Sequence, residues 1–191
     1  MRYRAETLTA LLRDAVPAFA QAGIRFTSIH GGAAKSLLPL EVATTNQHAT
    51  HQAAVIALAG DYTGGAALGS VLPEVPLAGV HPVYGADSAC LWLARFEITY
   101  HMPSTTDLEV QAVVPPEQHE AIRAGFWKGK AAMLPQRVTF SNDAGQLVAE
   151  GVFVYYLRHA AHIAARAPNQ RAGIMHQHLL KSSARLVANV R

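Results

Sequence analysis

Apolar side chains in the first part of the chain recur first at helical and then at alternating spacing. From residue 5 to residue 22 they return every three or four positions, which predicts a helix that Pro17 should kink or break. Gly23 suits the end of this helix. Residues 24–30 alternate as a short strand, and residues 33–44 read as a second strand interrupted by a proline.

The segment from Gln52 to Leu68 has a different pattern. Residues 53–59 are seven consecutive apolar residues, and no polar face accompanies them. A helix without a polar face must be buried on all sides. The sequence therefore predicts one long helix in the core of the protein.

Strand-like segments dominate the rest of the folded region. They cover residues 89–101, 106–114, 130–140 and 147–158, and a short helical stretch at 117–123 separates the second from the third. A sheet that is followed by no further core helix has to curl around the one it has. We therefore predict an α+β hotdog fold, in which a curved antiparallel sheet of about six strands wraps one long buried helix.

Charge distinguishes the end of the chain from the rest. The 191 residues carry a net charge of +3, and residues 158–191 hold six basic residues and no acidic one. We expect a hotdog domain at 1–158, including the N-terminal helix, and a basic helical tail at 159–191. Apolar residues near helical spacing at 177–190 indicate an amphipathic helix that docks on the domain or on a partner. A solvated basic face explains the tail more simply than nucleic acid does, so no nucleic-acid partner is expected.

Several classes of protein do not fit the remaining sequence features. Cys90 is the single cysteine, so no internal disulfide can form, and we expect a cytoplasmic protein. The longest uncharged stretch, residues 42–60, is interrupted by amide and imidazole side chains and makes a poor membrane span. The pairs His159-x-x-His162 and His176-x-His178 match no strong zinc pattern, so neither a metal nor another cofactor is expected.

Asp61 is the candidate for chemistry, because it is the only formally charged residue between Glu41 and Glu74. It falls within the buried helix or just after it. Burial penalises an ionised carboxylate and raises its pKa, which suits a general base. An aspartate that caps a neighbouring backbone amide, or that emerges where the helix ends, explains the same position without chemistry.

The polar residues before the buried helix could form the second half of a site. Thr50 is the best candidate for capping this helix, and the first amides, at Ala53 and Ala54, could stabilise an oxyanion. Asp61 lies about one to three turns further along. One subunit therefore need not combine the two features, whereas a dimer can bring them together across its interface.

This segment resembles the helix entrance of the phenylacetyl-CoA-type hotdog thioesterases. Their pattern is an Asn, then Gly-Thr, then His-Gly-Gly, and an acid nine residues after that His. Asn46, Thr50 and Asp61 match the Asn, the Thr and the acid. Gln52 stands in place of the His, and Ala53-Ala54 replaces the Gly-Gly pair.

The resemblance extends to an uncharacterised branch of hotdog thioesterases and covers roughly residues 10–158. Further similar segments are Pro17-Ala18-Phe19, Phe96–Met102, Gly129-Lys130 and Asp143-Ala144-Gly145. It implies a homodimer or dimer of dimers whose sheets join, with active sites at the subunit interface. It also implies hydrolysis of acyl-CoA or acyl-carrier-protein thioesters.

The resemblance assigns provisional roles to individual residues. Asp61 would activate water or attack the thioester directly, while the amides of Ala53 and Ala54 hold the oxyanion. Asn46 and Gln52 would position water or the carbonyl group. The remaining residues expected at the substrate are Thr50, His48 and His51.

Two other functions stay open. Hotdog domains also support hydration and dehydration of acyl thioesters, which would need Asp61 paired with His48 or His51. A hotdog domain without catalytic activity, which binds acyl chains or serves for dimerisation, is the other alternative. The replacement of the motif histidine by Gln52 is compatible with it.

Overall fold

Six antiparallel strands form one sheet in the computed structural model of the protein, which describes residues 3–81, 85 and 87–164. The strand order is β1-β2-β4-β5-β6-β3. The strands are β1 (Arg25–His30), β2 (Ala33–Leu38), β3 (Ala89–Tyr100), β4 (Leu108–Val113), β5 (Ala132–Ser141) and β6 (Leu147–His159). The helices are α1 (Ala5–Ala15), α2 (Pro17–Gln21), the 3-10 helix η1 (Val42–Thr44), α3 (Ala53–Ser70), α4 (Pro116–Trp127) and α5 (Ala161–Ala164).

The N-terminal helical region is broken at Pro17, as its sequence predicts. Helix α1 ends at Ala15, and Pro17 begins α2 because a proline fits the first turn of a helix but not its interior. Helix α1 packs against β1. The Thr9 hydroxyl accepts a hydrogen bond of 2.9 Å from the backbone amide of Phe26 and so ties the helix to the strand.

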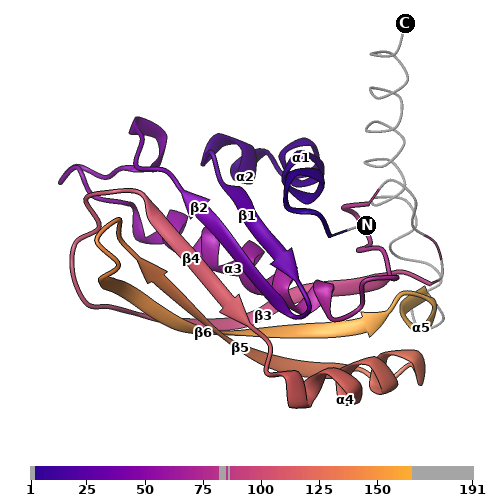
Figure 1. Ribbon diagram of the computed structural model, residues 1–191. Coiled ribbons are helices and arrows are strands. Elements are labelled where there is room, and N and C mark those ends of the chain that lie inside the picture. The colour runs from indigo at the N-terminus through magenta and orange to yellow at the C-terminus, as the bar shows by residue number, and fades with distance from the viewer. Residues whose placement is uncertain (1–2, 82–84, 86, 165–191) are drawn as a thin grey trace, which may run out of the picture.

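Helix α3 lies within the curve of the sheet and contacts all six strands (Figure 1). Its second half is almost wholly buried, as the absence of a polar face predicts. Glycines allow the sheet to come this close, because a Cβ at Gly60 would overlap the Phe153 ring and one at Gly64 would overlap the Tyr155 hydroxyl. The predicted hotdog arrangement, a curved antiparallel sheet around one buried helix, is therefore confirmed.

Two element boundaries differ from the prediction by more than two residues. Strand β2 ends at Leu38, and the chain then turns into η1 instead of continuing as a strand to Thr44. The Thr44 hydroxyl explains the turn, since it donates to the Pro39 carbonyl at 2.8 Å and accepts from the Glu41 amide at 2.8 Å. Helix α4 continues past the expected residue 123 to Trp127, which brings the buried Phe126 onto the domain.

Strand β3 forms one edge of the sheet and is long and largely exposed. Within the described part of the chain no strand pairs with its free edge, apart from a single parallel bridge between Leu77 and Ala89. Phe96 and Tyr100 leave 49% and 45% of their surface open to solvent. A long apolar edge of this kind is a surface on which another strand can pair.

The expected amphipathic helix at 177–190 lies outside the described residues. No helix in the described part of the chain is both long enough and apolar enough to span a membrane.

Candidate active site

A cavity with a volume of about 240 Å³ adjoins Asp61 and lies between α1, α3, β3 and the segment 77–80. Asp61 is the only charged residue among those described that line it. The remaining lining is apolar or aromatic: Leu8, Leu12, Tyr62, Gly65, Ala66, Leu77, Ala78, Val80, Ala89, Leu91, Trp92, Leu93 and Tyr155. The cavity therefore combines an apolar wall with one carboxyl group.

The Asp61 carboxyl is electrostatically unusual. Burial raises its pKa from the ordinary value of 3.8 to about 6, because the ionised form loses hydration. No described residue pairs with the carboxylate through an ion pair or a side-chain hydrogen bond. The group is therefore largely ionised at neutral pH while remaining basic enough to accept a proton.

Tyr155 fixes the helix backbone at Asp61. It is 1% exposed, and its hydroxyl donates to the carbonyl oxygen of Asp61 at 2.6 Å and to that of Gly60 at 3.4 Å. Burial raises the pKa of Tyr155 well above its ordinary value, the charge of Asp61 adds to the rise, and the Gly65 amide opposes it. Tyr155 therefore stays a neutral hydrogen-bond donor and holds the peptide that carries the carboxyl group.

The start of α3 presents free backbone amides. The sequence favours Thr50 as the cap of this helix, but Gln52 occupies the capping position and makes no side-chain cap bond. Among the described residues, the amides of Ala53 and Ala54 have no hydrogen-bond acceptor, and both residues are exposed. The Tyr100 hydroxyl donates to the Ala53 carbonyl at 3.1 Å. The two amides are free to bind an oxyanion.

Asn46 organises the loop that leads to α3. Its side-chain oxygen accepts from the His48 amide at 2.9 Å, and its side-chain nitrogen donates to the Thr50 hydroxyl at 2.9 Å. Ala49 adopts a left-handed φ of 57° in this turn. His48 is exposed, while the Gln52 side-chain amide donates to the Thr45 carbonyl at 2.8 Å. Asn46 and Thr50 thus bond mainly to each other and to the loop.

His51 is buried and bound on both ring nitrogens. Nε2 lies 3.1 Å from the Pro39 carbonyl, which can only accept, so Nε2 carries the proton. Nδ1 lies 2.7 Å from the Ser104 hydroxyl, which then donates to it. Burial lowers the pKa of His51 and favours this neutral form, although the Pro39 carbonyl and Asp107 oppose the shift. His51 therefore anchors the loop before α3 to Pro39 and Ser104.

The two halves of the predicted site are separated within one protomer. Ala53 and Ala54 precede Asp61 by eight and seven residues, which corresponds to about 11–12 Å along the helix axis. None of the loop residues singled out from the sequence lines the cavity, and neither does any histidine of the described chain. A single protomer therefore cannot present the helix start and Asp61 to the same small group.

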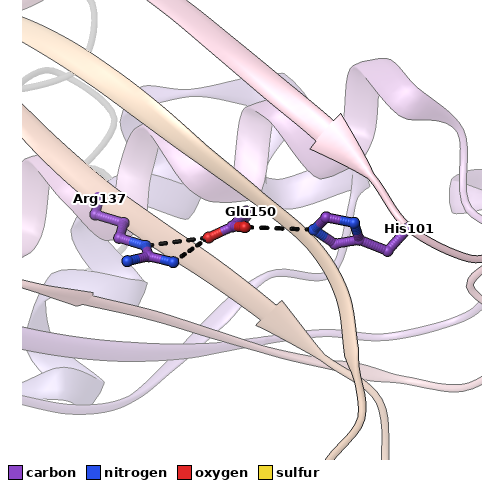
Figure 2. Close-up of polar contacts among 3 residues, drawn as sticks. All are labelled: His101, Arg137 and Glu150. Atoms are coloured by element: carbon purple, nitrogen blue, oxygen red, sulfur yellow. Dashed lines mark hydrogen bonds and ion pairs between the residues drawn. The ribbon is translucent and has the colours of Figure 1, made fainter.

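Figure 2 shows a second polar cluster, in which Glu150 lies between Arg137 and His101. Arg137 and Glu150 occupy the sheet face opposite α3 and form an ion pair, and His101 Nε2 lies 3.5 Å from Glu150. The Arg137 hydrogen bond is the main cause that lowers the pKa of Glu150. The neighbouring groove also contains Glu97. This mixture of charges is poorly suited to phosphate groups, and it lies away from the Asp61 cavity.

Cys90 is a core residue. Its thiol is buried and free, and burial raises its pKa, so the thiol stays protonated and is a poor nucleophile. No three potential metal ligands lie together in the described ranges. His176 and His178 fall outside those ranges.

Sequence reasoning missed the residues that shape the cavity. The helical spacing of apolar residues at 5–22 places Leu8 and Leu12 on one face, but the pattern does not say which strand that face covers. Alternation along β6 could have placed Tyr155 on the buried face. Its contact with Asp61 depends on how β6 packs on α3, which the sequence pattern does not define.

Comparisons with known proteins support the fold. No protein-family model and no curated protein sequence matches the chain. A solved structure of a candidate thioesterase from Shewanella oneidensis is 22% identical, with a TM-score of 0.66 over 82% of this chain and 98% of that one. A Haemophilus influenzae thioesterase matches at 9% identity and a TM-score of 0.60, covering 82% of this chain and 91% of that one. Zebrafish thioesterase superfamily member 2 matches at 16% identity and 0.55, covering 80% and 97%.

These likenesses establish that the chain has the hotdog fold found in thioesterase structures. At identities of 22%, 9% and 16%, the likenesses show the fold alone.

Proposed function

We propose that the protein hydrolyses acyl thioesters, with Asp61 as the general base or the nucleophile. One observation carries this proposal: a lone carboxyl group with a pKa near 6 lines an apolar cavity on the central helix of the fold. A base of this pKa is ionised at neutral pH and can still take up a proton during the reaction.

In the general-base route, Asp61 accepts one proton and later returns it. The Asp61 carboxylate takes a proton from water as the water oxygen adds to the thioester carbonyl carbon. The carbon–sulfur bond then breaks, and the leaving thiolate receives the proton from Asp61. The products are a carboxylic acid and a free thiol. In the alternative route, the carboxylate adds directly to the carbonyl carbon, and the carbon–sulfur bond breaks as the thiolate leaves. Water then hydrolyses the resulting anhydride, which releases the carboxylic acid, regenerates the Asp61 carboxylate and supplies the proton that the thiolate takes up.

The oxyanion in this mechanism requires a second subunit. The free amides of Ala53 and Ala54 are suitable donors, but they lie too far from Asp61 within one protomer. A homodimer in which the exposed β3 edges pair would join the two sheets. It would also cover the exposed aromatic side chains Phe96 and Tyr100, of which Tyr100 bonds to the first residue of α3. We infer that the helix start of one subunit works with Asp61 of the other.

The remaining loop residues either hold the turn that leads to α3 or orient the substrate beside it. Asn46 and Thr50 hold the turn before α3, and His51 anchors it to Ser104. Gln52 lies beside the free amides, where its side-chain oxygen can orient water or the carbonyl group. His48 is exposed on the same loop and available to the substrate.

The substrate class follows from the shape of the cavity. Ligand pockets that enclose drug-sized molecules span roughly 300–1,000 Å³, so a cavity of about 240 Å³ accepts an acyl group but not its carrier. Coenzyme A or an acyl carrier protein would remain outside. We place the reaction in the cytoplasm, where the single unpaired thiol of Cys90 would be stable.

A thiol-release assay tests the proposal. Wild-type protein and Asp61→Asn would be compared on acyl-CoAs of increasing length and on aromatic acyl-CoAs, with Asp143→Asn in the exposed β5–β6 turn as the matched control. We expect Asp61→Asn to lose thiol release by at least about a hundredfold, within the range of general-base effects. Equal rates for wild type and Asp61→Asn would remove Asp61 from the chemistry.

The same substrates separate the competing functions. Hydration of an enoyl-CoA without thiol release would identify a hydratase. Saturable binding of acyl-CoA without any turnover would identify a non-catalytic acyl-binding domain.

A further inference from the structure

The glycines of α3 differ in what surrounds them. At Gly60 and Gly64 a Cβ would overlap side chains of β6, and at Gly69 it would lie 2.8 Å from the Tyr3 ring. At Gly65 a Cβ would meet Leu91 Cδ2 at 3.5 Å and Tyr155 Cε1 at 3.7 Å, which are ordinary contact distances. Close packing therefore accounts for three of the glycines but not for Gly65.

The backbone does not require glycine at this position either. Gly65 lies in the middle of α3, and it is not among the glycines with positive φ. A glycine inside a helix lowers helix stability relative to alanine. The glycine at position 65 therefore makes α3 less stable than an alanine would, although neither packing nor backbone conformation requires it.

The cavity supplies a reason. Gly65 lines the Asp61 cavity, and it lies four residues after Asp61, so the two residues are neighbours on one helix face about 6 Å apart along the axis. An acyl chain whose carbonyl group is at Asp61 would extend past Gly65. Leu8 and Leu12 of α1 and Leu91 of β3 wall the same space.

We propose that Gly65 determines the largest acyl group that the cavity accepts. This inference rests on the proposed function. Counting about 30 Å³ for each water-sized group, a cavity of about 240 Å³ holds on the order of eight such groups. The preferred substrates are therefore compact, apolar acyl groups, and a methyl group at position 65 would shorten the longest chain that fits.

Gly65→Ala tests the size limit directly. It adds one carbon to the cavity wall and makes no steric overlap with neighbouring side chains. The variant would be assayed for thiol release with straight-chain acyl-CoAs from butyryl to palmitoyl. We expect kcat/KM to fall roughly tenfold or more for the longest chain that the wild type accepts, the effect of one misplaced methylene in an apolar pocket. The rate with butyryl-CoA should be unchanged.

Two further variants sharpen the test. Leu91→Val removes the Cδ2 atom that the new methyl group would face, so the double variant Gly65→Ala/Leu91→Val should regain the longer substrate. Gly125→Ala makes the same substitution in α4, where a Cβ meets nothing within 4 Å and the Asp61 cavity is remote. Gly125→Ala should leave chain-length preference as in the wild type.

A binding measurement separates this inference from the proposed reaction. Dissociation constants of free fatty acids of the same lengths would be measured by displacement of a fluorescent apolar dye. If the wild type releases no thiol from any acyl-CoA, hydrolysis is contradicted, yet a selective loss of the longer acids in Gly65→Ala would still support the size limit. An equal effect on all lengths, no effect, or no binding of any acid by the wild type would overturn it.

Discussion

The Asp61 carboxyl is more acidic in the unfolded chain than in the folded one. Its folded pKa is about 6 against an ordinary value of 3.8, so the folded state binds the proton more tightly. As far as Asp61 is concerned, the free energy of unfolding is therefore highest below about pH 4. It falls as pH rises from about 4 to about 6. A shift of this size corresponds to about 3 kcal/mol at neutral pH, which the rest of the fold must offset.

Asp61→Asn should accordingly stabilise the protein while removing the proposed activity. We expect the free energy of unfolding of the variant to exceed that of the wild type by up to about 3 kcal/mol at pH 7.5 and by much less at pH 4. Urea unfolding at both pH values measures the difference. Asp143→Asn, in an exposed turn, controls for the general effect of losing a carboxylate. A wild type that is the more stable protein at pH 7.5 would contradict the argument.

Tyr155 acts on Asp61 through the helix backbone. Tyr155→Phe removes the hydroxyl that donates to the Asp61 carbonyl and leaves the ring in place, which should cost about 1 kcal/mol of stability. We also expect kcat to fall more than KM changes, since the carboxyl group loses its fixed position. Tyr156→Phe provides the comparison, because it removes a tyrosine hydroxyl of the same strand that bonds to Arg158 and not to α3. Equal small effects of both substitutions on kcat would rule out positioning by Tyr155.

At the scale of elements, α3 shows how glycine is used for close packing. The contacts of Gly64 and Gly65 differ although the two residues are adjacent. A Cβ at Gly64 overlaps the Tyr155 hydroxyl, whereas one at Gly65 makes ordinary contacts.

Alanine at these two positions should therefore change stability in opposite directions. We expect Gly64→Ala to destabilise the protein by about 1–3 kcal/mol through overpacking. Gly65→Ala should stabilise it by up to about 1 kcal/mol through helix propensity. Chemical denaturation of the two variants measures both effects. A stabilising Gly64→Ala would contradict the expected overpacking against Tyr155.

The elements themselves were largely predictable from the sequence, because hydrophobic periodicity decides them. The break at Pro17 and the buried helix follow from local rules. The end of β2 does not, since it depends on a hydroxyl group at Thr44 that bonds back to Pro39. The cap of α3 was also misassigned, because Thr50 bonds to Asn46 instead of to the helix. Asp61 was identifiable by its isolation among uncharged residues, whereas Tyr155 was not, because its role depends on packing between distant segments.

At the scale of the whole molecule, the proposed mechanism requires a second copy of the chain. The helix start and Asp61 are about 11–12 Å apart along one helix, and β3 leaves apolar side chains uncovered at the sheet edge. Pairing of two β3 edges would cover these side chains, and it would let the helix start of one subunit approach Asp61 of the other.

Disruption of this edge should abolish both dimerisation and activity. We expect sedimentation to show a dimer for the wild type and a shift towards monomer for Phe96→Glu, together with loss of thiol release. Met133→Glu is the matched control, because Met133 is an exposed apolar residue, 55% accessible, on β5. A fully active monomer of Phe96→Glu would contradict the shared site.

The dependence of thiol release on pH tests the central claim, that Asp61 is the group that reacts, most directly. We predict that kcat/KM of the wild type rises about tenfold per pH unit below pH 6 and levels off above it, following ionisation of Asp61. Asp61→Asn should show no such rise and only residual activity throughout. A wild-type profile that is flat between pH 5 and pH 8, or an Asp61→Asn profile that coincides with it, would contradict the claim.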